Sequence, residues 1–131
     1  MPEYPDLTAY LEAMRPRVIG DPLEAIRLAS PFILRSVDPP IKELVGKRVL
    51  ELRRIGKRLV FALEGELFIV IHLMISGRLH WKERGAKPAG KIGLASFDFP
   101  KGTLTFTEAS SKKRASLYLV RGERELASFE R

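Results

Sequence analysis

The sequence predicts a mainly β protein with some α-helix (α+β). We expect an antiparallel β-sandwich of about eight strands, with an N-terminal helix and a second short helix. Two observations predict this class. Short apolar segments follow one another between residues 49 and 120, separated by tight turns and by no helical pattern. Helical patterns lie before Gly46. A chain of 131 residues, 45% of them hydrophobic, suffices for one domain with one core.

The first predicted helix covers residues 2–14, because Leu7, Leu11 and Met14 share one face at helical spacing. We expect Pro16 to end this helix, since the residue before a proline disfavours helical dihedrals.

Two further elements are expected before the strand-rich part. The stretch at residues 25–34 predicts a strand. Residues 41–45 predict a short helix, for which Asp38 provides the N-cap and Gly46 the stop.

The remaining elements are strands. Gly65 predicts a hairpin turn, and the polar residues 82–91 predict a flexible loop. The expected strands are residues 49–53, 59–63, 67–74, 78–82, 92–99, 103–107 and 116–120. Residues 121–131 are charged and are expected to be the start of a linker.

The composition restricts the function. Lys and Arg number 23 against 16 Asp and Glu, with an isoelectric point near 10, which favours a polyanionic partner such as nucleic acid. The chain has no cysteine and only His72 and His80, so no metal site is expected. No apolar run could span a membrane, and the acidic N-terminus differs from a secretion signal, so we expect a cytoplasmic protein.

Pro2 is the residue with the most specific chemistry. If Met1 is removed, Pro2 becomes a secondary amine, and an α-amino group with a pKa of about 7.7–8 is partly neutral near neutral pH. Attack of this amine on an aldehyde carbon forms an iminium, which acts as an electron sink. Glu3, next in the chain, could transfer protons. A Met-Pro-Glu start also occurs without any catalytic role.

Three motifs together narrow the interpretation. They are Met-Pro-Glu-Tyr-Pro-Asp-Leu at residues 1–7, Arg-Arg-Ile-Gly-Lys at 53–57 and His-Leu-Met-Ile-Ser-Gly at 72–77. In this order and at about this spacing, they resemble the formamidopyrimidine-DNA glycosylase / endonuclease VIII family. The resemblance covers residues 1–120 and only that family's N-terminal domain.

The resemblance implies a domain organisation and four roles. Residues 1–120 would form the N-terminal catalytic β-sandwich domain, and residues 121–131 would begin the linker to an absent C-terminal domain. The zinc finger of the family belongs to that second domain, so no cofactor is expected in this chain. The implied roles are nucleophile at sugar C1′ for Pro2, proton transfer for Glu3, base removal beside a phosphate for Lys57 and phosphate contact for His72.

The sequence departs from the family in two places. Ile75 occupies the position of the Met that wedges into the space left by the flipped base, while Met74 lies one position early and could belong to the core. Glu108 replaces an Asp of the family. A longer basic loop then replaces a Pro-Arg-Arg-Phe stretch, and its expected DNA-binding residues are Lys112, Lys113 and Arg114.

The resemblance implies base-excision repair of oxidised DNA bases by a bifunctional DNA glycosylase and abasic-site lyase. The Pro2 amine would form a Schiff base with C1′, followed by β-elimination, with or without δ-elimination. The expected partner is double-stranded DNA with damaged bases or abasic sites, bound by a monomer of a bacterial type associated with the nucleoid. The alternatives are a non-catalytic damaged-DNA-binding module and an N-terminal-proline tautomerase, for which a parallel βαβ pattern would be expected.

Overall fold

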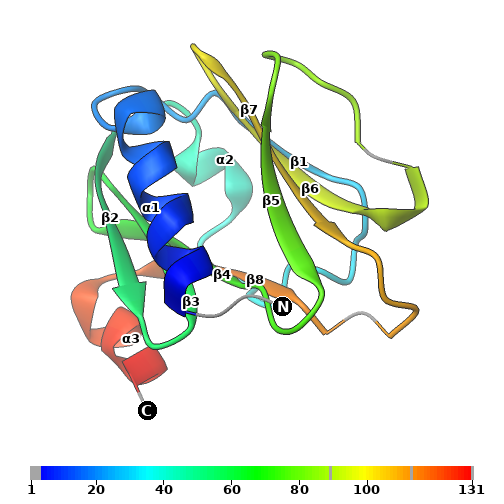
Figure 1. The fold of residues 1–131 in the computed structure, drawn as a ribbon. Coiled ribbons are helices and arrows are strands. Elements are labelled where there is room, and N and C mark those ends of the chain that lie inside the picture. The colour runs from blue at the N-terminus through cyan, green and yellow to red at the C-terminus, as the bar shows by residue number, and fades with distance from the viewer. Residues whose placement is uncertain (1–3, 89, 113, 131) are drawn as a thin grey trace.

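The computed structural model describes residues 4–88, 90–112 and 114–130. Two four-stranded sheets face each other, and helix α1 (Tyr4–Val18) covers one side of the sandwich (Figure 1). All pairs between the named strands are antiparallel, which confirms the predicted β-sandwich with helices. The parallel βαβ pattern of a tautomerase is therefore not found among these strand pairs.

The first sheet has the strand order β2-β3-β4-β8. Gly65, with φ of 80°, lies in the turn between β3 and β4, as the sequence predicts. The strands are β2 (Val49–Ile55), β3 (Arg58–Leu63), β4 (Leu67–His72) and β8 (Ser116–Arg121).

The second sheet has the order β1-β6-β7-β5, so its edge strands β1 and β5 are far apart in the sequence. A short 3-10 turn, η1 (Gly90–Ile92), precedes β6. The strands are β1 (Ala25–Leu28), β5 (Gly77–Lys82), β6 (Gly93–Phe99) and β7 (Gly102–Glu108).

Aromatic side chains fill the space between the sheets. The ring of Phe61 in β3 stacks on Phe97 and Phe99 of β6, with centroids 6.5 and 6.3 Å apart, so a single core joins the two sheets. Helix α1 adds a row of buried residues at helical spacing to this core, namely Leu7, Leu11, Met14 and Val18.

Two predicted boundaries near the N-terminus are wrong. Helix α1 runs past Pro16 to Val18, because the exposed Pro16 lies in the last turn and burial of Val18 holds that turn against the core. The strand predicted at residues 25–34 ends at Leu28. Beyond it, Ile33 and Arg35 exchange backbone hydrogen bonds with Leu117 of β8, so this segment covers the edge of the other sheet.

The short helix α2 (Ile41–Leu44) confirms the predicted element, and Gly46 follows it with φ of 91°. The predicted N-cap is wrong, because Pro40 holds that position without a side-chain hydrogen bond and the Asp38 carboxylate pairs with Arg121.

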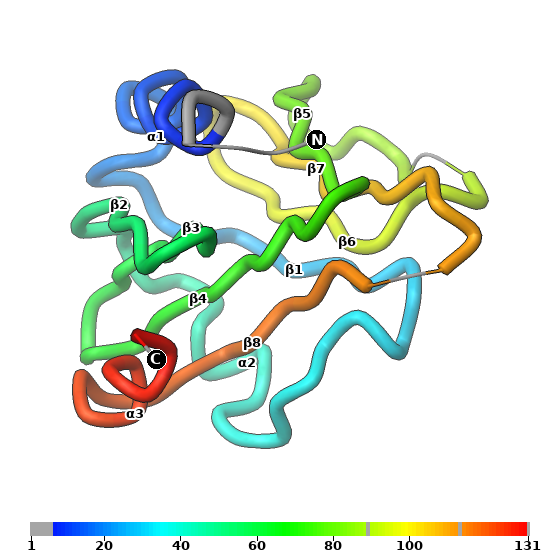
Figure 2. Tube along the Cα trace, turned by 60° about the horizontal axis from the view of Figure 1, so that its bottom comes forward, coloured from blue at the N-terminus to red at the C-terminus, as the bar shows by residue number. Residues whose placement is uncertain are grey.

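The described part of the tail is helical. Helix α3 (Glu123–Ala127) and the 3-10 turn η2 (Ser128–Glu130) lie beside the first sheet (Figure 2). Leu126 is buried there and Phe129 contacts Tyr118 edge to face, so apolar burial orders a segment expected to be the start of a linker.

Four segments meet at the lower end of the sandwich in Figure 1. Three of these segments are connections, namely the β2–β3 turn, the β4–β5 turn and the β7–β8 loop, and the fourth is the start of α1. The opposite end carries the β6–β7 turn. Within the described ranges, no helix has the length and apolarity needed to cross a membrane.

Candidate nucleic-acid interface

Lys57 lies at the tip of the β2–β3 hairpin. Gly56 adopts φ of 61°, a left-handed conformation that glycine allows without strain, and Ile55 pairs with Arg58 across the turn. This turn presents Lys57 to solvent. Its ammonium group makes no ion pair with any residue that the structure describes, so it is free to bind an external anion.

His72 lies at the end of β4, where it pairs with Arg58 of β3 on one side and with Ser116 of β8 on the other. Partial burial lowers the pKa of His72 below its ordinary value of 6.5, and the positive charges of Arg58 and Lys57 lower it further. The imidazole is therefore mainly neutral at neutral pH. Arg58 and Lys57 form a small region of positive potential beside His72 that is suited to a phosphate group.

Arg58 is a member of this cluster that the motifs did not indicate. Its guanidinium lies over the ring of Phe129 and donates a hydrogen bond to the Phe129 carbonyl, at 2.9 Å. The hairpin predicted from the sequence is sufficient to identify Arg58 as a neighbour of His72. Pairing Leu63 with Leu67 around Gly65 places residue 58 opposite residue 72, as the observed register does.

The β4–β5 turn holds Ile75 at the surface. Gly77 donates a backbone hydrogen bond to the Leu73 carbonyl at 2.9 Å, and Met74 adopts φ of 59°. A Cβ atom on Gly77 would lie 2.3 Å from that carbonyl oxygen, so the tight turn requires glycine. Ile75 is 61% exposed at the tip. Met74 is half-buried in the turn and does not belong to the core, contrary to the alternative considered for it.

The basic β7–β8 loop lies beside this turn. Gly77 pairs with Glu108, so the last residue of β7 adjoins the first of β5. Both loops line a cavity of about 290 Å³, whose walls are Ile75, Ser76, Glu108, Ser110, Lys112 and Arg114. Ile75 is thus brought together with two of the three cations predicted to bind DNA.

The predicted site residues consequently form two groups at one end of the molecule, Lys57 with His72 and Ile75 with the basic loop. Pro2, Glu3 and Lys113 lie outside the described residues. Among the residues that are described, no three His, Asp or Glu side chains gather as a metal site would require.

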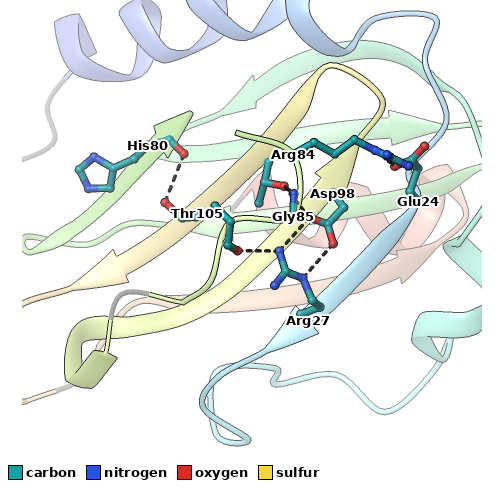
Figure 3. A network of polar contacts seen from close by, with 9 residues as sticks. Glu24, Arg27, His80, Arg84, Gly85, Asp98 and Thr105 are labelled. Carbon is teal, nitrogen blue, oxygen red and sulfur yellow. Dashed lines mark hydrogen bonds and ion pairs between the residues drawn. The ribbon is translucent and has the colours of Figure 1, made fainter. Parts of the chain in front are cut away.

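The other end of the second sheet has a different polar arrangement. Arg27 of β1 makes two hydrogen bonds of 2.8 Å to the Asp98 carboxylate of β6, and Thr103 donates a third (Figure 3). Although burial raises the pKa of Asp98, these hydrogen bonds and the charges of Arg27 and Arg84 together hold it below its ordinary value. Asp98 is therefore ionised and internally compensated.

This network also fastens the segment that the sequence predicts as a flexible loop. Gly85 donates its N–H to Thr103 Oγ1 at 2.7 Å, Arg27 donates to the Ala86 carbonyl at 2.8 Å, and Arg84 pairs with Glu24 (Figure 3). Residues 84–86 of the predicted loop are thus in contact with polar groups that are distant in the sequence.

The chain is similar to known proteins in sequence. Residues 1–114 match the model of the formamidopyrimidine-DNA glycosylase N-terminal domain. The chain is 30% identical over 105 residues to the formamidopyrimidine-DNA glycosylase of Mycoplasma genitalium, across 79% of this chain and 37% of that protein. It is 33% identical over 105 residues to that of Lactobacillus gasseri, with the same coverage of 79% and 37%.

Solved structures are similar in fold. A structure of MutM with DNA containing carbocyclic 8-oxo-G superposes with a TM-score of 0.85 at 23% identity, covering 98% of this chain and 47% of that one. Lactococcus lactis Fpg with DNA containing an abasic site gives a TM-score of 0.84 at 23% identity, covering 97% and 47%. The chain thus spans less than half the length of these relatives.

Proposed function

The chain belongs to the formamidopyrimidine-DNA glycosylase family, and from this premise we propose that it binds damaged double-stranded DNA and cleaves it through the Pro2 amine. The proposed activity is that of a bifunctional DNA glycosylase and abasic-site lyase in base-excision repair. The observation that carries the proposal is the gathering of Lys57, His72, Ile75 and the basic loop at one end of the sandwich.

The geometry supports the DNA-binding step. Lys57 and Arg58 provide positive potential for a phosphate beside His72, and Lys112 and Arg114 provide a second cationic group beside an exposed apolar side chain. An enzyme that acts on a base must extrude the nucleotide from the stack. Ile75, exposed on a rigid turn, is suited to fill the space left by that base, as apolar wedges do.

The chemical step is assigned to Pro2 and Glu3. Attack of the neutral Pro2 nitrogen on C1′ breaks the bond to the base, which leaves with a proton, and opening of the sugar ring yields an iminium. Loss of the C2′ proton then breaks the C3′–O bond and releases the 3′ phosphate, and water hydrolyses the iminium to regenerate the amine. Glu3 would transfer the protons.

Borohydride trapping tests the enzymatic part. The chain, with removal of Met1 verified by mass spectrometry, is mixed with abasic-site duplex and sodium borohydride. We expect a covalent protein–DNA adduct that Pro2→Gly abolishes. Duplex binding without an adduct would instead establish the non-catalytic damaged-DNA-binding alternative. A chain that neither binds nor forms an adduct would contradict both.

A cytoplasmic, nucleoid-associated location is part of the same proposal, since the curated relatives are bacterial and the substrate is DNA. We also propose that the protein acts as a monomer. Fractionation of cells before and after nuclease treatment tests the location, because association with the nucleoid predicts release of the protein when the DNA is digested.

A further inference from the structure

Glu108 is a buried acidic residue at the cationic end of the sandwich. Its side chain is 1% exposed, although burial of an ionised carboxylate is costly unless hydrogen-bond donors surround it. Its carboxylate accepts hydrogen bonds from the backbone N–H groups of Arg114 at 3.2 Å and of Ala115 at 3.1 Å. These donors lie six and seven residues further along, at the far end of the basic loop.

The Glu108 carboxylate therefore joins the start of the basic loop to its end. The loop leaves β7 at Glu108, and the side chain of the same residue holds the backbone just before β8 begins at Ser116. Inside the loop, Lys112 donates its N–H to Ser110 Oγ at 3.2 Å. The carboxylate binds main-chain groups, so the charged ends of Lys112 and Arg114 are not consumed by these bonds.

The same residue connects the loop to the neighbouring turn. Glu108 pairs in the sheet with Gly77, which ends the tight turn that carries Ile75. Glu108 also contributes to the wall of the cavity between Ile75 and the two loop cations. A displacement of the Glu108 carboxylate would therefore change the loop relative to the turn without changing any exposed charge.

We propose that Glu108 is a positioning residue that fixes the basic loop over the β4–β5 turn, so that Ile75, Lys112 and Arg114 meet DNA as one preorganised surface. This inference rests on the proposed DNA-binding function and adds a residue to it. Preorganisation matters because a loop that is ordered only on binding loses conformational freedom, and that loss weakens affinity.

A double-mutant cycle tests the inference through the loop cations. Glu108→Gln keeps the size of the side chain but replaces one accepting oxygen by an amide donor, which opposes one of the two backbone N–H groups. Binding to a duplex with a tetrahydrofuran abasic-site analogue is measured by fluorescence anisotropy. We expect Glu108→Gln to weaken binding about 5- to 10-fold, as for loss of a charge-assisted hydrogen bond.

The decisive comparison is the same substitution in the Lys112→Ala/Arg114→Ala background. We expect less than a twofold further loss there, because the cations that Glu108 positions are already absent. An equal fold loss in both backgrounds would show a general structural role and overturn the inference. Glu64→Gln is the matched control, since its carboxylate also accepts a backbone N–H, from Arg48 at 2.8 Å, and it should leave affinity unchanged.

Hydrogen exchange on the unmodified chain tests the geometry without relying on a variant that folds. The amide hydrogens of Arg114 and Ala115 should exchange as slowly as those of adjoining β8. Exchange as fast as in an unstructured loop would contradict the inference.

The two proposals can fail separately. Absence of binding by the unmodified chain would reject the proposed function and, with it, the role of Glu108 toward DNA. Binding by the unmodified chain with equal losses in both backgrounds would reject only the role of Glu108.

Discussion

The buried carboxylates at the two ends of strand β7 accept hydrogen bonds from different kinds of donor. At one end, the Asp98 carboxylate beside Thr103 is met by the guanidinium of Arg27, so the charges cancel within the fold. At the other end, Glu108 is met by backbone N–H groups. The nearby side chains of Lys112 and Arg114 form no ion pair with the described residues.

This difference separates a structural network from a binding surface. Charges that are paired within the fold stabilise it, but they are not available to bind a ligand. Cations held in place by backbone contacts keep their charge for an external partner, and DNA phosphates are such a partner. The same contrast applies to Lys57, whose neighbour Arg58 carries a charge of the same sign and so does not cancel it.

Gly77→Ala should disrupt the cationic end of the sandwich, and it has the largest expected effect of these variants. The added Cβ would lie 2.3 Å from the Leu73 carbonyl oxygen, so the turn that carries Ile75 must open. We expect the free energy of unfolding to fall by about 3 kcal/mol or more, as for severe steric strain, measured by urea denaturation. Gly56→Ala is the control, because its Cβ would meet open space and only its positive φ opposes it, at about 1 kcal/mol. Equal losses for both would contradict the steric account.

Asp98→Asn should weaken the network of Arg27 and Asp98 at the other end of the sandwich. Loss of the carboxylate leaves Arg27 without its charged acceptor, so we expect the free energy of unfolding to fall by about 2 kcal/mol at neutral pH. DNA affinity should not change. Because the folded-state pKa of Asp98 is lowered, its ionised form stabilises the protein above the ordinary value of 3.8, and this contribution is lost as the pH falls below it. The difference between variant and unmodified protein should accordingly shrink in acid.

Asp38→Asn provides the control for this prediction. Asp38 also pairs with an arginine, Arg121, but its side chain is 72% exposed, so solvent screens the pair. We expect a change of less than about 0.5 kcal/mol. If Asp98→Asn were equally mild, the network around Arg27 would not be what orders that end of the sheet.

Lys57→Ala should have the opposite effects to Asp98→Asn, with a loss of DNA affinity and almost no change in stability. The exposed side chain packs against little, so stability should change by less than about 0.5 kcal/mol. Affinity for abasic-site duplex should fall about 5- to 10-fold, and the slope of log affinity against log salt should decrease by about one, as for one lost phosphate contact. Anisotropy titrations at several salt concentrations measure both. Lys101→Ala is the control. Lys101 lies in the β6–β7 turn at the opposite end of the sandwich, and its ammonium group pairs with the Asp21 carboxylate.

The smallest expected effect is the pH dependence of DNA binding through His72. Its pKa in the free protein lies below 6.5, and a bound phosphate should raise it by stabilising the imidazolium. Affinity should therefore increase about two- to threefold as the pH is lowered through this range, consistent with one linked proton. His72→Gln should remove the increase. An identical pH profile for the variant would assign the effect to another group.

Much of the fold could be predicted because local patterns dictate it. Two continuous apolar runs with Gly65 between them predict the β3–β4 hairpin, and Gly46 marks the stop of the short helix α2. The errors occur where a local signal competes with burial. Pro16 marks a helix end by its own chemistry, yet the helix continues because Val18 is buried.

The candidate site was predictable in its members but not in its grouping. The motifs name Lys57, His72 and Ile75 without stating which of them are neighbours, and they do not mark Arg58. The register of the β3–β4 hairpin, which follows from pairing around Gly65, brings Arg58 beside His72. In the same way, the sequence marks Glu108 as a substitution within a motif, while its contact with the far end of the basic loop depends on how that loop closes.

The sequence by itself determined the antiparallel sandwich, the family and the kinds of residue at the site, because hydrophobic periodicity, turn chemistry and short motifs act over a few neighbouring positions. The tertiary structure decided which charges are cancelled and which remain available. Arg27 and Asp98 are 71 residues apart in the chain, and no local rule pairs them. The partner of a buried charge is chosen by packing of distant segments, since only in the folded core does an unpaired carboxylate become costly.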